Sequence, residues 1–391
     1  MYNIRDYLKW RGDLSFEQDG FNEVDNLILS TLAYIEFDGV VPFDATSDRV
    51  QLKEIADQVY AAIDMDAPRA KNPFFTQIPM LFLEAAATKR FGGLELSFYI
   101  NRIDLEHSEQ FSAMVFSIND NLHYIAFRGT DDMLVGWKED FQMSFMDEVQ
   151  AQKDAVAYVK YIIEALKGNL YLGGHSKGGN LAVYAAVSLE EANDRMIAIY
   201  NNDGPGFQEK FLESSGYHEV LPKIHTIIPN TSVVGMMMEH LEEYVVVNSN
   251  QKGIYGHNAF SWEVLGNHFV NRQGLKKSSI ILNRALRQWL SKITVEERAS
   301  FVEVLFEILY ASGLVTVSGI ASDKFTAANG MLKAYKTMEP DAKKMMRRLI
   351  SLLIEEGQKV FISSLGEDIG SLRIGNKHVA NKKIKGYITL K

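Results

Sequence analysis

The spacing of hydrophobic positions changes twice along the chain and divides it into three parts. Residues 1 to about 90 show a helical spacing, with a helix-start signal at 22–25 and further helices expected near 52–63 and 77–89. From about 90, short runs rich in β-branched and aromatic residues predict strands. After about 270 the spacing is helical again, so a sheet-forming part is expected between two helical ones.

The middle part predicts a mainly parallel sheet. The runs LELSFYINRID, QFSAMVFSI and LHYIAF predict antiparallel strands, with the turn signal Asn-Asp-Asn between the last two. Helical patterns follow at 137–146 and 149–166. The runs NLYLGG, MIAIY, IHTII and YVVVN then read as strands, with a helix at 178–189 after the first. Alternating strands and helices indicate a largely parallel, right-handed sheet.

The last part predicts a helical appendage, with helices at 278–293, 323–338 and 341–357 and a capping box at Thr294–Glu297 that opens another. The most apolar stretch, 301–321, carries two glutamates one helical turn apart. Placing them in a bilayer would cost roughly 2.5–3.5 kcal/mol each, so a buried helix is favoured over a transmembrane segment. We expect one unit at 1–275, with a helical segment at 1–90 and a core at 90–270, followed by a helical region at 276–391.

Composition narrows the function classes. The chain is 47% hydrophobic, which is enough to bury a large core, and its 391 residues exceed the length that one hydrophobic core usually supports. The net charge of −9 is an ordinary solubility charge and argues against nucleic acid as a partner. The absence of cysteine excludes disulfides, thiolate metal sites and cysteine nucleophiles. Charges interrupt the N-terminal apolar residues, so no signal peptide is visible and a cytoplasmic location is expected.

The sharpest motif is Gly174-His175-Ser176-Lys177-Gly178, a match to G-x-S-x-G between a predicted strand and a predicted helix. This context predicts a nucleophile elbow with Ser176 as the nucleophile. Gly174 and Gly178 would leave room where a Cβ would clash, and the backbone N–H of Lys177 would point at an oxyanion. Such glycines would also suit a phosphate loop, but G-x-x-x-x-G-K-[ST] and G-x-G-x-x-G are both absent. His175 is expected to pack or hydrogen-bond locally.

Upstream residues extend this motif into a family resemblance. The run FRGT at 127–130, the W-x-x-D match at Trp137 and Asp140, and G-H-S-x-G together resemble the class 3 (fungal-type) lipases. The resemblance implies an α/β-hydrolase fold with a mainly parallel central sheet. It also implies that Thr130, after Gly129, closes an oxyanion hole with the Lys177 N–H, and that Trp137 and Asp140 brace this loop.

The N-terminal stretch YLKWRGDLSFEQDGFNEVDNLILSTLAYIEF resembles a bacterial domain-of-unknown-function family allied to those lipases. The lipase-like resemblance covers about 90–270, and the narrower one extends over most of the chain. It implies the fold and a reaction class but supplies no substrate.

The general base and the acid are expected after Ser176 in the chain. His257 is the predicted base because it lies in a loop after the last predicted strand, and the resemblance points to the same place. At the position of the lipase acid the chain has Ser232. Asp203, at the end of the preceding strand, is the alternative acid, although it could instead cap the turn Asp-Gly-Pro-Gly.

These residues predict a serine hydrolase that cleaves carboxylic esters, acyl or lipid-like, through an acyl-enzyme. The alternative is a non-catalytic, hydrolase-like binding or scaffolding protein, which Ser232 and the helical appendage favour. No metal signature appears, and the chemistry needs no cofactor. The apolar stretch Val233–Met238 suits a lid, an acyl-pocket wall or a buried helix start. Peripheral membrane contact is compatible with the sequence, and the oligomeric state is left open.

Overall fold

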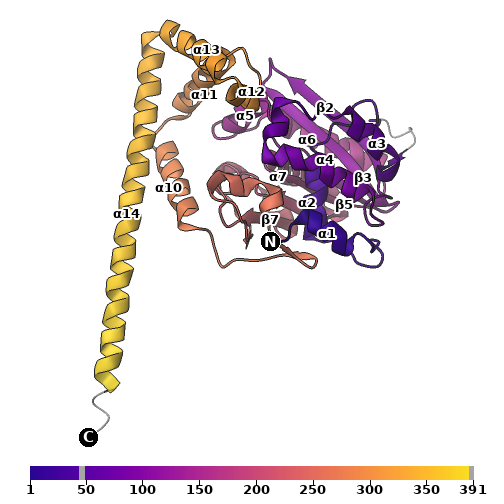
Figure 1. The fold of residues 1–391 in the computed structure, drawn as a ribbon, viewed down its shortest axis with the longest axis horizontal. Helices are drawn as coiled ribbons and strands as arrows, with labels where there is room; N and C mark the ends of the chain where they lie inside the picture. Colours follow the sequence, from indigo (N-terminus) through magenta and orange to yellow (C-terminus); the bar gives the residue numbers. More distant parts are fainter. Residues whose placement is uncertain (44–48, 387–391) are drawn as a thin grey trace.

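The computed structural model describes residues 1–43 and 49–386, with side chains at all of these except 191 and 365–386. Eight strands form one sheet in chain order (Figure 1). They are β1 (Val50–Gln51), β2 (Glu95–Asp104), β3 (Glu109–Asn119), β4 (Leu122–Phe127), β5 (Asn169–His175), β6 (Met196–Asn202), β7 (Ile224–Pro229) and β8 (Tyr244–Val247).

The strand directions explain where a site can form. β1 to β4 pair antiparallel, and β4 to β8 pair parallel. The register sets Phe127 beside Gly174 and His175 beside Asn202. The carboxyl ends of five strands therefore meet at one edge, where ligands bind in open α/β sheets. This arrangement is the α/β-hydrolase fold expected from the sequence.

Helices cover both faces of the sheet because alternate strand residues point in opposite directions. Met114 and Phe116 of β3 join the core under α1 (Ile4–Arg11), α2 (Glu23–Leu32), α3 (Leu52–Ala62) and α4 (Pro73–Ala86). Ala113 and Val115 join the opposite core under α6 (Gln150–Ala165), α7 (Lys177–Ser188), α8 (Glu209–Leu212) and α9 (Ser215–Val220). A two-stranded sheet of β9 (Val264–Leu265) and β10 (His268–Phe269) adjoins α1 and α2.

A buried ion pair anchors the N-terminal helices. The side chains of Arg90 and Asp25 are fully buried and lie 2.6 Å apart. Tyr7 also donates a hydrogen bond to Asp25, and Arg90 donates to the carbonyls of Asp19 and Gly20. Every charge taken out of water here has several polar partners, which is the condition under which a buried pair is tolerated.

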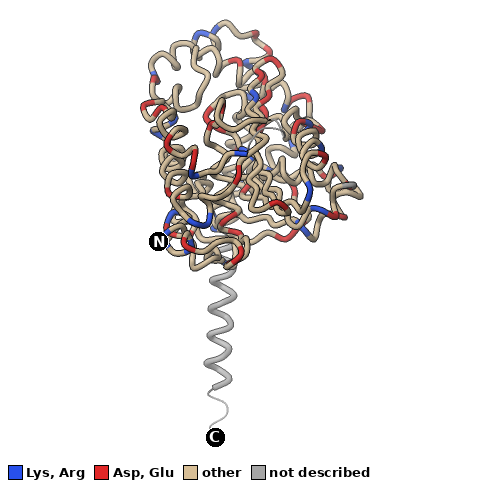
Figure 2. Tube along the Cα trace, turned by 90° about the vertical axis from the view of Figure 1, so that its right-hand side faces the viewer, with Lys and Arg blue, Asp and Glu red and all other residues tan. Residues whose placement is uncertain are grey.

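The C-terminal helices lie along one side of the sheet domain (Figure 1). They are α10 (Lys277–Ser291), α11 (Val295–Tyr310), α12 (Val317–Ser322), α13 (Lys324–Thr337) and α14 (Pro340–Gly386). Within the described residues, no helix combines the length and apolarity needed to cross a membrane. Figure 2 shows Lys and Arg interspersed with Asp and Glu along the described trace.

Several predicted boundaries move. The helix expected at 77–89 begins at Pro73, because Asn72 caps it and proline suits the first helical position. The apolar stretch 301–321 is two helices, interrupted near Gly313, whose φ of +76° favours glycine. The helix expected to end at 357 continues to Gly386.

Candidate active site

The turn between β5 and α7 has the strained geometry of a nucleophile elbow. Ser176 has φ +59° and ψ −133°, a conformation that side-chain-bearing residues rarely adopt. A Cβ on Gly174 would lie 2.3 Å from the backbone of Gly178, and one on Gly178 would lie 2.1 Å from the carbonyl oxygen of Phe127. Lys177 is the first residue of α7, so its backbone N–H has no acceptor within the helix.

The structure brings the predicted base and acid together. His257 ends the 3₁₀ turn η5 (Gly253–His257), and its Nδ1 lies 2.7 Å from Oδ2 of Asp203. Asp203 follows β6, is fully buried and has φ +53°. The turn that starts at Asp203 is capped by Asn201, which accepts the N–H of Gly204 at 2.9 Å. The carboxylate of Asp203 is therefore directed at the histidine rather than used as a turn cap.

Ser232, at the position where the resemblance places the lipase acid, is hydrogen-bonded to the Asp203 carboxylate. Its hydroxyl donates to Oδ1 of Asp203 at 2.5 Å, and the N–H of Gly235 donates to the same oxygen at 3.1 Å. Ser232 and Asp203 are both fully buried, beyond the carboxyl ends of the neighbouring strands β7 and β6. Hydrogen bonds from neutral donors to a buried carboxylate stabilise its charged form. The apolar stretch Val233–Met238 contains the short turn η4 (Val234–Met236), which carries one of these donors.

Ser176 lies beside this pair but is not bonded to it. Among the described residues, its hydroxyl makes no hydrogen bond to His257; Ser176 is 8% exposed and the His257 side chain 22%. In structures without substrate, catalytic hydrogen bonds are often long or unformed. His257 and Asp203 are thus hydrogen-bonded to each other, whereas in the part of the chain that the structure describes the Ser176 hydroxyl is bonded to neither.

His175 packs locally, as expected. Burial holds the pKa of its imidazole well below the ordinary value, so the ring is neutral. Its Nε2 therefore donates to the carbonyl of His257 at 2.8 Å, and its Nδ1 accepts from the hydroxyl of Tyr34 at 3.1 Å. The ring thereby ties the loop of His257 to the end of β5.

The loop after β4, residues 128–133, is called the oxyanion loop below, after the role that the resemblance implies for Thr130. Thr130 donates its hydroxyl to Oδ2 of Asp140 at 2.6 Å, which commits the one hydroxyl proton and leaves the backbone N–H of Thr130 as its donor to a ligand. Burial raises the pKa of Asp140 to about 6. A Cβ on Gly129 would meet the Tyr34 hydroxyl at 2.2 Å and the His175 carbonyl at 2.3 Å, so the loop needs glycine there. Trp137, expected to brace the loop, is 37% exposed on α5 (Leu134–Gln142).

The sequence also matches the model of a known protein family. The model of a protein family described as Mbeg1-like matches residues 85–307, more than half of the chain. The chain belongs to the Mbeg1-like family. The family is related to lipases, so the predicted membership of a lipase-allied family is confirmed, whereas the bacterial origin stays a prediction.

Solved lipases resemble parts of this Mbeg1-like chain. M37 lipase is 16% identical over 43% of this chain and 65% of its own, just under two thirds of its length, with a TM-score of 0.31. A fungal lipase–inhibitor complex is 13% identical over 52% of this chain and 83% of its own, with a TM-score of 0.31. The Rhizomucor miehei lipase propeptide complex is 15% identical over 57% and 86%, with a TM-score of 0.32. No curated protein matches the chain.

A buried network behind the elbow was missed from the sequence. Nζ of Lys177 lies 2.8 Å from Oε2 of Glu139 and from the carbonyl of Gln110, and both charged side chains are 1% exposed. Glu139 also accepts the N–H groups of Gln110 and Ala151. The residue after Ser176 is thus tied to α5, α6 and β3. The motif G-x-S-x-G does not signal this role, because Lys177 occupies one of its unspecified positions.

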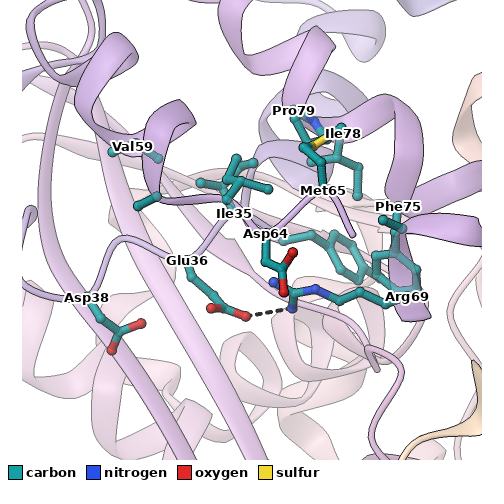
Figure 3. Close-up of a pocket in the computed structure, with 14 residues that line it drawn as sticks. Ile35, Glu36, Asp38, Val59, Asp64, Met65, Arg69, Phe75, Ile78 and Pro79 are labelled. Carbon is teal, nitrogen blue, oxygen red and sulfur yellow. Dashed lines mark hydrogen bonds and ion pairs between the residues drawn. The ribbon is translucent and has the colours of Figure 1, made fainter. Parts of the chain in front are cut away.

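A cavity of about 180 Å³ is lined by residues between Tyr34 and Pro79 of the N-terminal segment (Figure 3). Its wall is largely apolar, with Tyr34, Ile35, Phe75 and Ile78, and Figure 3 shows the Arg69–Glu36 ion pair, 2.6 Å long, beside these side chains. The cavity and the elbow share Tyr34. In the described part of this Mbeg1-like chain, no three His, Asp or Glu side chains group so as to hold a metal ion.

Proposed function

We propose that the chain is a serine hydrolase that cleaves carboxylic esters through an acyl-enzyme. One observation carries the proposal. The His257–Asp203 hydrogen bond lies at the same sheet edge as a serine held in the strained conformation of an elbow. Because the catalytic groups all come from the chain itself, the reaction as proposed uses no cofactor.

The proposed reaction starts with attack of the Ser176 oxygen on the ester carbonyl carbon while His257 Nε2 takes the hydroxyl proton. The backbone N–H groups of Thr130 and Lys177 would hold the oxyanion. When the tetrahedral intermediate collapses, the carbon–oxygen bond to the alcohol breaks and His257 returns the proton to the leaving alcohol. Water then attacks the acyl carbon while His257 takes its proton, the bond from the acyl carbon to the Ser176 oxygen breaks, the carboxylic acid leaves and His257 returns the proton to Ser176. Asp203 would stabilise the imidazolium in both steps.

The environment of Asp203 supports its part in this scheme. An acid that orients a histidine must stay ionised, although burial favours the neutral form. Ser232 and Gly235 both donate to the oxygen that does not face His257, so both oxygens of this buried carboxylate have hydrogen-bond partners. The alternative of a non-catalytic scaffolding protein rested on Ser232 at the acid position and on the helical appendage. The support from Ser232 weakens, since it serves an acid supplied by the neighbouring strand.

The cavity supports an apolar acyl group as part of the substrate. Its wall shares Tyr34 with the elbow, and the hydroxyl of Tyr34 reaches Gly129 and His175. Apolar pockets with a few polar groups at one end suit such ligands. We further propose an acyl or lipid-like ester as substrate, a cytoplasmic location consistent with the absence of cysteine, and peripheral contact with membranes as the route to lipid esters.

The test is labelling with a fluorophosphonate probe together with turnover of soluble chromogenic esters. Ser176→Ala is compared with Ser188→Ala, a matched change on α7 that removes only a hydrogen bond to the carbonyl of Tyr184. We expect labelling and turnover in wild type and in Ser188→Ala. Loss of the nucleophile costs on the order of 10⁶ in turnover in a serine protease, so Ser176→Ala should fall to background. Folded wild-type protein that neither labels nor turns over any ester would contradict the proposal and favour the scaffold alternative.

A further inference from the structure

The C-terminal helical region pairs with the oxyanion loop. Residues 315–318, called the strap here, run antiparallel to residues 132–134, with Thr316 opposite Met133. The N–H of Leu134 donates to the carbonyl of Val315 at 2.8 Å, and the N–H of Val317 donates to the carbonyl of Asp132 at 2.9 Å. The strap therefore contacts the chain two to four residues after Thr130. Figure 1 shows α12, which begins in the strap, close to α5.

The side chain of Asp132 depends on the strap. Ser318 donates its N–H to Oδ1 at 3.0 Å and its hydroxyl to Oδ2. Asp132 is 6% exposed, and among the described residues its carboxylate accepts no other hydrogen bond. Burial raises the pKa of this carboxyl, while the bonds from Ser318 and the charge of Arg69 oppose the rise. An ionised carboxylate at this position thus takes its hydrogen bonds from the C-terminal region alone.

The hydrolase core holds the rest of the oxyanion loop. Arg128 donates to Asn101 at 2.9 Å, and Asp131 accepts from Gln110 at 2.6 Å. These contacts secure the loop next to Thr130 on either side, and Asp132 is the next residue along. Among the described contacts, the hydroxyl of Ser318 is the only side-chain donor to this loop that comes from beyond residue 275.

Packing of neighbouring helices keeps the strap in place. Val302 and Phe306 of α11 form a small core with Leu134 of α5, and Lys138 lies 2.8 Å from Glu303. On the other side of the site, Arg287 of α10 donates to the carbonyl of Met238, close to the turn whose Gly235 binds Asp203. The C-terminal region thus contacts both the oxyanion loop and the segment that supports the acid.

We propose that the strap is a working part of the active site and that Ser318 is a positioning residue for the oxyanion hole. The inference rests on the proposed ester hydrolysis. Donors stabilise an oxyanion only when they are already fixed where the charge develops. Ser318 holds Asp132, Asp132 restrains the oxyanion loop, and the loop sets the backbone N–H of Thr130. The C-terminal helices consequently act in catalysis without touching the substrate.

The experiment compares Ser318→Ala, Ser318→Thr and Ser322→Ala in the full chain. Ser322 lies on the same short helix but donates only to the carbonyl of Gly319, which makes it the matched control. A displacement of about 1 Å at a catalytic group can cost 10²-fold, so kcat for a soluble ester should fall about 10- to 100-fold in Ser318→Ala, with KM nearly unchanged. Ser318→Thr keeps the hydroxyl and should recover most of kcat, and Ser322→Ala should match wild type.

A second variant removes the same bonds from the other side. Asp132→Ala and the double variant Asp132→Ala/Ser318→Ala should lower kcat by similar factors, because the two residues act as one unit. Thermal unfolding and circular dichroism check that each variant folds. If Ser176-dependent turnover exists and Ser318→Ala keeps the wild-type kcat, or Ser322→Ala falls equally, this inference is overturned and the proposed function stands. If the wild type lacks Ser176-dependent turnover, both the proposed function and this inference are overturned.

Discussion

The proposed role of Asp203 as the acid can be tested by moving the carboxylate from the residue after β6 to position 232 in the loop after β7. In Asp203→Asn, the new amide can still accept from Ser232 with its oxygen, but it then presents an NH₂ group to Nδ1 of His257. Ser232→Asp, added to that variant, returns a carboxylate from the position where class 3 lipases carry their acid. We expect turnover to fall in the first variant and to recover partly in the second.

The magnitude follows from the tautomer of the histidine. A donor opposite Nδ1 forces the imidazole into the wrong tautomer, and the matching change in a serine protease lowers turnover about 10⁴-fold. That factor corresponds to about 5.5 kcal/mol on the barrier. The Ser232 oxygen lies 2.5 Å from Oδ1 of Asp203, so a carboxylate at position 232 would lie close to the original carboxylate. It should raise turnover roughly ten- to a hundredfold above that of Asp203→Asn.

The single variant Ser232→Asp should behave differently from the double. With Asp203 still present, two carboxyl groups would share one buried site, and such neighbours cannot both be ionised. The pair would hold a proton between them, which raises the pKa of one member and lowers both stability and turnover at neutral pH. The double variant is therefore expected to exceed Asp203→Asn in turnover, although Ser232→Asp alone is damaging.

The assay is steady-state hydrolysis of a soluble chromogenic ester, with thermal unfolding to confirm the fold. Asp203→Asn/Ser232→Asn is the matched control, since it has the same shape without the charge and should show no recovery. Undiminished turnover in Asp203→Asn would refute the role of Asp203. Equal turnover in the Asp and Asn double variants would show that charge at this edge of the sheet is irrelevant.

Two further predictions concern stability. Burial raises the pKa of Asp140 from 3.8 to about 6, so the folded state binds its proton more tightly than the unfolded state, and about 3 kcal/mol of stability present below pH 4 is lost as the pH rises through 6. Asp140→Asn should remove this loss in urea unfolding between pH 4 and 7, and identical pH profiles for the two proteins would contradict the reasoning. Arg90→Ala leaves Asp25 buried without its cation and should cost about 3–5 kcal/mol, whereas Arg5→Ala, at a partly exposed pair with Glu84, should cost less than about 1 kcal/mol. Similar unfolding free energies for these two variants would refute the argument.

Features with short-range causes could be predicted from the sequence. The elbow depends on close approach between Gly174 and Gly178, which are four residues apart, and the motif records that requirement directly. The strands of the sheet follow from alternating or continuous apolar runs, and the run FRGT marks the oxyanion loop. Helix ends were less certain, because the start of α4 is set by a cap at Asn72 and the length of α14 by no local stop signal.

Features that join distant segments could not be predicted. Ser232 reads as the loss of an acid until the structure places its hydroxyl against Asp203, 29 residues earlier in the chain. Glu139 under Lys177 and Ser318 on Asp132 likewise have no spacing that would reveal them.

The sequence by itself determined the fold class, the family and the serine at the elbow, because each of these is encoded by residues adjacent in the chain. Only the tertiary structure decided which carboxylate faces His257, what holds it there and which distant helix restrains the oxyanion loop. The physical reason is that neighbouring strands bring their ends together whatever the length of chain between them. A hydrogen bond across that edge depends on distance in space and leaves no period in the sequence.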